Sequence, residues 1–285
     1  MQPRIGIIGT GKVGCTLARL WNQAGYEITA VYNRTPEKAE MLVQHIPLAQ
    51  VVKSPPVIAA MADIILLTVR DDALQQITSK LSDFDWSGKI AVHTSGAASI
   101  DVLQEIVDAG AMVGSLHPIF PFADVETAIR DLQGSTFAIE ASDERVQQRL
   151  TELVESLRGQ ILLIPLGKKP LYHAALAIAS NYTVTLYAIA ESILVSLGAK
   201  RAVADNALNV LIEATVKNIQ QQGIPQALTG PLTRADVSTI QAHLNAIDDE
   251  TLGTVYKGLA RLSYPMLQER GIDITQIEQV IQENT

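Results

Sequence analysis

The chain has 285 residues, and 47% of them are hydrophobic, so it can bury a sizeable core and is expected to form two domains. Its formal net charge of −8 argues against nucleic acid as a partner, because phosphate binding needs a basic surface. A single cysteine excludes an intrachain disulfide framework and a cysteine-based zinc site. We expect no metal site, no targeting segment at the N-terminus, and a cytoplasmic location.

Short β-rich runs alternate with helical patterns over the first 165 residues, which predicts a mostly parallel, doubly wound sheet covered by helices on both faces. The predicted strands are 4–9, 27–33, 49–52, 63–69, 89–94, 111–116, 136–140 and 160–165. Beyond them, helices are predicted over 169–197, 201–222, 235–246, 249–270 and 274–283. The fold class is therefore an α/β Rossmann domain over residues 1–166 followed by an all-α domain over residues 167–285.

The first predicted strand runs into the motif Gly9-x-Gly11-x-x-Gly14, directly before a predicted helix. In this context Gly9 permits a tight turn, Gly11 lets the backbone approach a pyrophosphate, and Gly14 lets helix and strand pack closely. The alternative is a glycine-rich turn that binds nothing. The residues expected to bind a dinucleotide here are Gly9, Thr10, Gly11, Lys12, Val13 and Gly14.

The end of the second strand distinguishes between the two nicotinamide cofactors. A site for NAD usually has an acidic residue there, whereas this chain has Asn33, Arg34 and Thr35. Arg34 offers a fork of donors to a 2′-phosphate, so NADP is the expected cofactor, although Arg34 could also be a solvated loop residue. Thr68 and Val69, at the end of the fourth strand, are expected to lie close to it.

The stretch that follows the last strand is long and mostly apolar. Between Leu171 and Leu197 only Glu191 carries a formal charge, which raises the question of a membrane span. The stretch is rich in Ala, Ser and Thr and contains His173 and Asn181, so we expect a covered helix and no membrane insertion. Its apolar face would need a cover, which predicts a homodimer formed through the C-terminal helices.

Histidine suits a proton donor or acceptor because its pKa lies near working pH. His117 follows a strand at the end of the sheet where ligands bind, as does Ser95, and His173 opens the long helix. His173, Ser180 and Asn181 are spaced i, i+7, i+8 and share one helical face, which suggests a site. The alternative is a histidine and an asparagine that satisfy each other in the core.

One more segment, "LTGPLTRADVSTIQAHL", places Arg234 beside a predicted helix start. An arginine in this position can bind a substrate carboxylate. An ion pair between Arg234 and Asp236 is an equally good interpretation of the same residues.

These motifs together resemble those of known protein families. The N-terminal part resembles the NADP-binding domain of 6-phosphogluconate dehydrogenase, ketopantoate reductase and pyrroline-5-carboxylate reductase. With "HTSGAASIDVL", "SLHPIFPF", "YHAALAIASNY" and "LTGPLTRADVSTIQAHL", the whole chain resembles a bacterial family that joins this domain to a helical domain of unknown function. The resemblance implies a C-terminal domain like that of 6-phosphogluconate dehydrogenase.

The resemblance also implies roles. Ketopantoate reductases open the first C-terminal helix with a catalytic Lys followed by two Asn residues, which fall on His173, Ala177 and Asn181 here. Prephenate dehydrogenases, which are similar in their first domain, use a Ser and a His that fall on Ser95 and His117.

The resulting hypothesis is an NADP-dependent oxidoreductase that reduces the C=O or C=N bond of a small 2-oxo acid. His173 is the first choice as proton donor and His117 the second, with Asn181 and Ser95 orienting a substrate. The residues expected to bind that substrate are Arg234 and Ser180. The alternatives are a prephenate- or arogenate-type dehydrogenase and a non-catalytic NADP-binding sensor or assembly protein.

Overall fold

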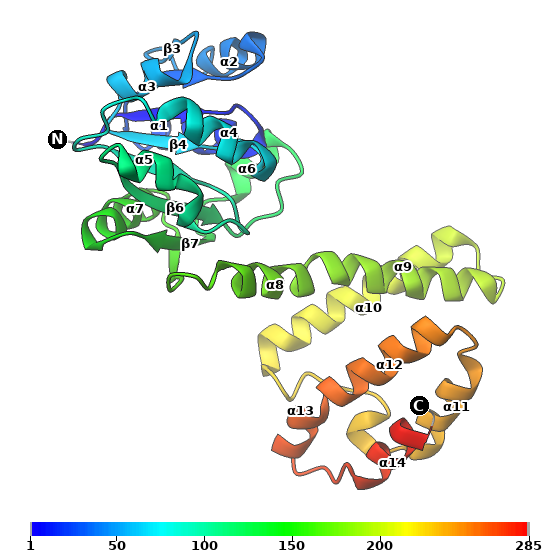
Figure 1. Ribbon diagram of the computed structural model, residues 1–285. Coiled ribbons are helices and arrows are strands. Elements are labelled where there is room, and N and C mark those ends of the chain that lie inside the picture. Colours follow the sequence, from blue (N-terminus) through cyan, green and yellow to red (C-terminus); the bar gives the residue numbers. More distant parts are fainter. Residues whose placement is uncertain (1, 284–285) are drawn as a thin grey trace. The chain divides into compact units, whose positions relative to one another are not determined.

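The computed structural model describes residues 2–283, which form two units that divide between Tyr182 and Thr183 (Figure 1). The first unit contains a sheet with helices on both faces. The second unit contains only helices among its described residues. The two predicted classes of structure, α/β and all-α, are therefore both present.

The sheet of the first unit has eight strands in the order β3-β2-β1-β4-β5-β6-β7-β8. All neighbouring pairs are parallel except β6 and β7, which are antiparallel. The strands are β1 Ile5–Ile8, β2 Ile28–Tyr32, β3 Gln50–Val51, β4 Ile64–Leu67, β5 Ile90–His93, β6 Met112–Pro118, β7 Thr136–Ala141 and β8 Gln160–Leu163. Every predicted strand is confirmed, as is the mostly parallel sheet.

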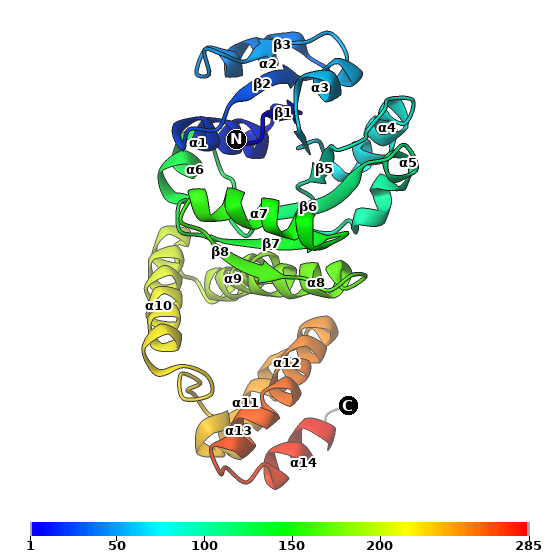
Figure 2. The same ribbon diagram turned by 90° about the vertical axis from the view of Figure 1, so that its left-hand side faces the viewer.

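Helices lie on both faces of the sheet (Figure 2). Between the helices and the sheet, two hydrophobic clusters cover its two faces. Side chains alternate between the faces along each strand, so Ile64 and Leu66 of β4 enter one cluster and Ile65 and Leu67 enter the other. One face carries α1 Lys12–Gln23, α2 Pro36–Val43, α6 Val125–Asp131 and α7 Glu144–Ser156; the other carries α3 Pro55–Met61, α4 Asp71–Leu81, the 3₁₀ helix η1 Ile100–Leu103 and α5 Gln104–Asp108.

The chain then continues in helices, the first of which, α8 Lys169–Ala179, belongs to the first unit. The others are α9 Asn181–Ser196, α10 Arg201–Gln222, the 3₁₀ helix η2 Leu232–Arg234, α11 Val237–Ala246, α12 Glu250–Leu262, α13 Tyr264–Glu269 and α14 Thr275–Glu283. The second unit has its own small core, built around Ile240, Leu267 and Ile277.

Two predicted helices are interrupted. The helix predicted over 169–197 is divided at Ser180, whose φ of −113° departs from helical geometry and separates α8 from α9. The helix predicted over 249–270 ends at Leu262, and α13 begins one residue before Pro265. Proline lacks the N–H that a helix interior needs, whereas the first turn tolerates it, so the chain starts a new helix there.

The division between the units falls after the boundary predicted at residue 166. The strands do end at Leu163, close to that boundary. However, α8 contacts the sheet unit through Lys169, which bonds to Ser95, and through Tyr172, which bonds to His117. The first helix of the predicted second domain is thus part of the first compact unit.

The stretch Lys169–Ser196 is long and apolar enough to cross a membrane, judged by length and composition alone. A single helix of this kind is weak evidence, because core helices of other proteins pass the same test. At its start the buried Lys169 side chain bonds to the strand-end loop of the sheet unit. This end of the stretch is therefore fixed to protein.

Candidate functional site

The glycine motif forms the turn that the sequence predicts. Gly9 has a φ of +106°, and a Cβ there would lie 2.8 Å from the backbone of Thr68. A Cβ on Gly14 would collide with Gly9 O and Thr68 Oγ1, whereas a Cβ on Gly11 would meet no described atom within 4 Å. Two glycines thus allow close packing, and the third leaves open space beside the backbone, as a bound pyrophosphate requires.

A cavity of about 340 Å³ opens above this turn, at the carboxyl ends of β1, β2 and β4. Helix α1 begins at Lys12, and Gly11 before it supplies no side-chain cap, so the first N–H groups of the helix are available to an anion. The Thr10 hydroxyl is buried and has no hydrogen-bond partner within residues 2–283. These features fit a phosphate group of a dinucleotide.

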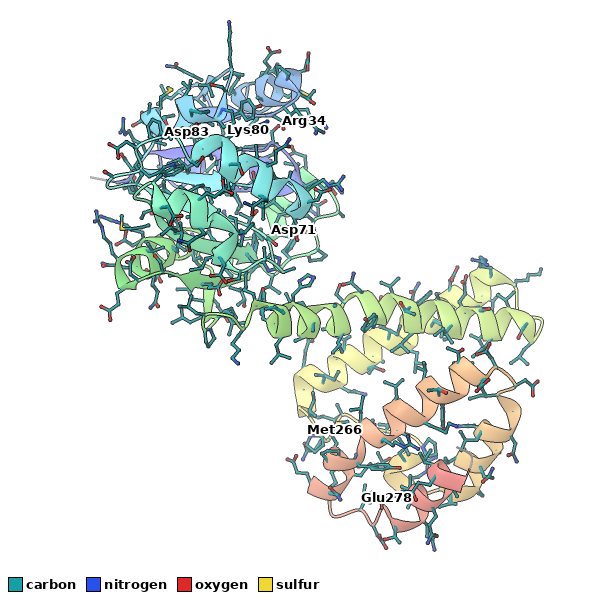
Figure 3. The ribbon with its side chains drawn as sticks, in the orientation of Figure 1. Arg34, Asp71, Lys80, Asp83, Met266 and Glu278 are labelled. Carbon is teal, nitrogen blue, oxygen red and sulfur yellow. The ribbon has the colours of Figure 1, made fainter. Side chains whose placement is uncertain are left out.

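The far part of the cavity carries positive charge. Arg34 and Lys80 line it, the first from the segment after β2 and the second from α4 (Figure 3). Lys38 of α2 is also a lining residue. Arg70 also lines it but is paired with Asp72 at 2.7 Å, and Asp72 is the one acidic residue among the lining residues. The cavity therefore suits a ligand with an additional phosphate at this end.

The predicted cofactor residues divide into two groups. The lining of the cavity includes Gly9, Thr10, Gly11, Asn33, Arg34, Thr35, Thr68 and Val69. Lys12, Val13 and Gly14 form the start of α1 and are not among the lining residues. Asn33 donates from Nδ2 to Thr35 O at 3.1 Å, which shapes the loop on which Arg34 lies.

Three segments converge around Gly96, which follows β5 and is buried. A Cβ placed on Gly96 would lie 2.8 Å from His117 Nε2 and 3.0 Å from His173 Nδ1. His117 lies near the end of β6 and His173 lies on α8, so the two histidines of the sequence hypothesis face the same point. The absence of a side chain at Gly96 is what makes room for both imidazole rings.

Lys169, at the start of α8, adds a third group to these histidines. Its side chain is fully buried, and Nζ donates a 2.9 Å hydrogen bond to the carbonyl oxygen of Ser95. Nζ also lies 5.4 Å from the centre of the Tyr172 ring, and the Tyr172 hydroxyl lies 2.7 Å from His117 Nδ1. These residues form a candidate catalytic cluster, called the catalytic cluster below, whose members are Lys169, Tyr172, His117, His173 and Gly96.

The environment of the cluster changes the proton affinities of its members. Burial lowers the pKa of Lys169 to about 8, while the charges of Glu140 and Asp71 oppose the shift. Burial, with the charges of Lys169 and His173, lowers the pKa of His117 to about 4, so its imidazole is neutral at pH 7. Burial raises the pKa of Tyr172. The cluster thus combines a cationic amine with a neutral imidazole.

Asp71 connects the cluster to the cavity. It is the first residue of α4, next to Arg70 and Asp72, both of which line the cavity. Its charge acts on Lys169. The catalytic cluster and the cavity are consequently neighbours within the first unit, at the carboxyl ends of the parallel strands, where Rossmann folds bind their ligands.

Other predicted site residues lie differently. The Ser95 hydroxyl is buried and accepts hydrogen bonds from Ala97 N at 3.2 Å and Ala98 N at 2.9 Å, so it shapes the loop that carries Gly96. Ser180 and Asn181 stand at the junction of α8 and α9 and are exposed. The interruption at Ser180 breaks the regular spacing that predicted one polar face.

Arg234 belongs to the second unit, at the end of η2, and is exposed. The neighbouring Asp236 caps α11: its carboxylate accepts from Thr239 N at 3.1 Å and from the hydroxyls of Thr239 and Ser238. The main use of Asp236 is therefore the helix cap.

Sequence reasoning missed Lys169, Tyr172 and Glu140. A signal for Lys169 existed, since it stands directly before Pro170 at a helix start and close to the predicted domain boundary. Glu140 offered a weaker signal, as the one charged residue in the apolar strand "TFAIEA".

The comparison with known families matches the two parts of the chain separately. Residues 1–118 match a Rossmann-like domain, and residues 135–263 match the Domain of unknown function DUF2520. The N-terminal part of the chain therefore matches a Rossmann-like domain, and the DUF2520 match begins just before β7 of the sheet unit and extends into the helical unit. This confirms the resemblance to a family with a C-terminal domain of unknown function.

Three known proteins illustrate the similarity. The chain is 30% identical over 199 residues to the uncharacterized oxidoreductase YfjR of Bacillus subtilis strain 168; the match covers 67% of this chain and 66%, just under two thirds, of that relative. BF3122 of Bacteroides fragilis, a candidate NADP oxidoreductase, matches with a TM-score of 0.72 and 24% identity over 90% of this chain and 96% of its own. Pyrroline carboxylate reductase of Plasmodium falciparum, with NADP bound, matches with a TM-score of 0.58 and 16% identity over 100% and 98% of the two chains.

Proposed function

We propose that the protein is an NADP-dependent oxidoreductase that reduces the C=O or C=N bond of a small 2-oxo acid or of an imine derived from it. The observation that carries the proposal is the convergence of Lys169, His117 and His173 around Gly96, in the same unit as the cavity above the glycine motif. The names of YfjR, BF3122 and the pyrroline carboxylate reductase support the reaction class.

The preference for NADP rests on the charges of the cavity. Arg34, Lys38 and Lys80 would hold a 2′-phosphate, and no carboxylate follows β2 among the lining residues to bind a free ribose hydroxyl. Gly9, Gly11 and the start of α1 would hold the pyrophosphate, while Thr68 and Val69 would lie against the rest of the nucleotide. When bound, the reduced cofactor supplies a hydride.

The cluster supplies the proton that must accompany the hydride. Lys169 is the proposed donor, because its pKa of about 8 keeps it protonated at pH 7 and makes it a better acid than a solvated lysine. His117 is neutral, and with Nδ1 bonded to Tyr172 its Nε2 faces Gly96 and can orient a substrate oxygen or nitrogen. His173 also faces Gly96 and remains a second candidate proton donor. Asn181, Ser180 and Arg234 stay proposed substrate contacts.

The comparison with ketopantoate reductase now includes the position of a lysine on α8. The sequence comparison put His173 in the place of the reductase lysine, whereas Lys169 stands one helical turn earlier on α8. A lysine amine is thus present beside the histidine. The proposal assigns the acid to Lys169 and a neighbouring substrate contact to His173.

A dehydrogenase of the prephenate type is the second candidate, since His117 is neutral and bonded to a tyrosine, as a base would be. The two are distinguished by direction: the reductase consumes NADPH with 2-oxo acids or imines, and the dehydrogenase generates it from an alcohol. An NADPH-binding protein without turnover in either direction would support a sensor or assembly role and contradict both.

We also propose a cytoplasmic homodimer in which a second copy covers α9 and α10. Within residues 2–283 no residue of α9 is buried, and large apolar side chains such as Val184 on α9 and Leu211 on α10 are exposed at 69% and 62%. Uncovered apolar surface of this kind marks an interface. Light scattering after gel filtration tests it: we expect a dimer that Leu211→Glu dissociates, and a monomeric wild-type protein would contradict it.

A further inference from the structure

Glu140 is a buried carboxylate outside the catalytic cluster. It lies on β7 and is 1% exposed. Its two carboxylate oxygens accept from two backbone groups that are far apart in sequence: Oε2 from Ile100 N at 3.0 Å and Oε1 from Gly167 N at 3.3 Å. A charged acceptor on two backbone N–H groups makes stronger hydrogen bonds than a neutral one.

The two segments that Glu140 joins are those that build the cluster. Ile100 begins η1, directly after the loop that contains Ser95 and Gly96. Gly167 stands two residues before Lys169. Lys169 then reaches back to Ser95 O, so the loop and the start of α8 are connected twice, once by a carboxylate and once by an amine.

Glu140 is also the end of a polar row across the sheet. In the strand register His93 pairs with Ser115, and Ser115 pairs with Glu140, so the three side chains lie on the same face. This is the face of α4 and η1, because Ala91 and Val113, two residues before His93 and Ser115, pack in that cluster. A polar row thus runs beneath the loop that holds Gly96.

Two atoms of this row have no hydrogen-bond partner within the described part of the chain, namely His93 Nε2 and Ser115 Oγ. His93 Nδ1 accepts from Ser95 N at 3.2 Å, which makes Nε2 the protonated, donating nitrogen. Such buried groups destabilise a fold when they stay unpaired, and internal water usually satisfies them. The row is therefore a polar floor rather than part of the apolar core.

We propose that Glu140 is the positioning residue of the catalytic cluster: its carboxylate fixes the Gly96 loop and the start of α8 relative to each other and supplies the buried negative charge that keeps the Lys169 amine seated as a cation. His93 and Ser115 extend this support as a polar floor. The effect of Glu140 on turnover rests on the proposed reductase chemistry, whereas its effect on the protonation of Lys169 does not.

The charged and titratable groups that face Lys169 come from several elements. Glu140 on β7 and Asp71 on α4 favour its cationic form. His117 on β6 is neutral at pH 7, and its own pKa is lowered in part by the charge of Lys169; the same is true of His93 on β5. Tyr172 lies under the amine on α8 and stays protonated because burial raises its pKa. Glu140 is consequently the buried anion of the set.

The test measures Lys169 without any turnover. Heteronuclear NMR of the full chain with ¹⁵N-labelled lysine across pH gives the titration midpoint of Lys169, whose signal is assigned by its loss in Lys169→Met. In Glu140→Gln the charge is lost while one acceptor oxygen remains, so we expect the midpoint to fall by about one pH unit or more, which is about a 10-fold larger ratio of neutral to protonated amine at any given pH. Glu144→Gln, an exposed carboxylate at the start of α7, is the matched control and should leave the midpoint unchanged.

Turnover is the second readout. If the reductase proposal holds, Glu140→Gln should reduce kcat about 10-fold or more and shift the alkaline limb of the pH profile by the same amount as the Lys169 midpoint, with NADPH affinity within about 2-fold of wild type. Equal Lys169 midpoints in wild type and Glu140→Gln would overturn the positioning role. A shifted midpoint in a protein that reduces no substrate would support that role and count against the proposed function.

Discussion

The Lys169 amine and the Ser95 carbonyl oxygen are 2.9 Å apart, and this one hydrogen bond joins the first helix after the sheet to the loop at the end of β5. The relationship crosses 74 residues of sequence. It buries a cation beside His117 and His173, at the edge of the cavity above the glycine motif. Burying an amine costs desolvation free energy, and lysine is rarely fully buried. A functional role for Lys169 is therefore a better explanation than a loop contact alone.

Lys169→Met should strongly reduce turnover while leaving cofactor binding intact. Loss of a general acid typically costs about 10²–10⁴ in rate, and Lys169 is not among the residues that line the cofactor cavity. Steady-state kcat and an NADPH fluorescence titration measure the two effects. Lys168→Met, which removes the neighbouring exposed lysine, is the control and should keep both values. Equal loss in both variants would contradict a specific role.

The pH dependence of kcat should follow the same amine. The pKa of Lys169 is about 8, and the donor is its protonated form, so reduction should be fastest below pH 8 and slow as pH rises above it. His117, with a pKa of about 4, stays neutral over this range and should contribute no limb between pH 5 and 8. A rate that increases from pH 7 to pH 9 would show that the essential group acts as a base.

Gly96→Ala should impair catalysis by the cluster without changing the lining of the cofactor cavity. The added methyl group would lie 2.8 Å from His117 Nε2 and 3.0 Å from His173 Nδ1, so it must push at least one ring away. We expect kcat/KM to fall about 10²-fold, because small displacements of reacting groups have effects of this size. Gly258→Ala is the control, since a Cβ there meets no described atom within 4 Å.

Arg34→Ala should weaken the binding of NADPH much more than the binding of NADH. A charge-assisted hydrogen bond contributes about 1.5–3 kcal/mol, which corresponds to a 10- to 100-fold change in the Kd of NADPH. Lys80→Ala should give a smaller loss in the same direction, and Lys53→Ala, an exposed lysine outside the cavity lining, should give none. Parallel titrations with the two cofactors decide this, and an equal loss for NADH would refute the 2′-phosphate role of Arg34.

His93→Asn should make the fold less sensitive to mild acid. Burial lowers the pKa of His93 to about 3 from 6.5, so the neutral form is favoured in the folded state. The unfolded chain binds a proton at His93 as pH falls below 6.5, whereas the folded chain does so only near pH 3. The free energy of unfolding that this residue contributes is therefore fully present above pH 6.5 and decreases as pH falls from 6.5 toward 3. Between pH 7 and pH 5 wild type should therefore lose about 2 kcal/mol more than the variant, whose side-chain oxygen can still accept from Ser95 N. Urea unfolding at the two pH values measures the difference.

The sequence predicts the sheet well because its signals are local. Alternating apolar strands, the glycine motif and the strand-end polar residues each require only a few neighbouring positions, and His117 was proposed in this way as a site residue. The interruption at Ser180 was not predicted, since helix periodicity continues through it. Pro265 gave a signal for the break between α12 and α13 that the long helix prediction overlooked.

Lys169 and Glu140 could not be predicted by the same reasoning, because their roles depend on contacts between distant segments. A lysine at a helix start is usually solvated, and only the docking of α8 across the strand ends buries this one. Glu140 alternates with Phe137 and Ile139 along β7, as a solvent-facing residue would, yet its face is covered by the loops that it holds. The polar atoms that organise the cluster come together only in the folded chain.

The most direct test of the central claim is isotope transfer from NADPH. The protein would be incubated with NADPH deuterated at the reactive nicotinamide carbon and a panel of 2-oxo acids with and without amines, and the products analysed by mass spectrometry. We predict deuterium in a 2-hydroxy or 2-amino acid product with wild type, and label transfer at least about 100-fold slower with Lys169→Met at equal NADPH occupancy. Label transfer by Lys169→Met at the wild-type rate, or NADPH binding without transfer to any member of the panel, would contradict the account.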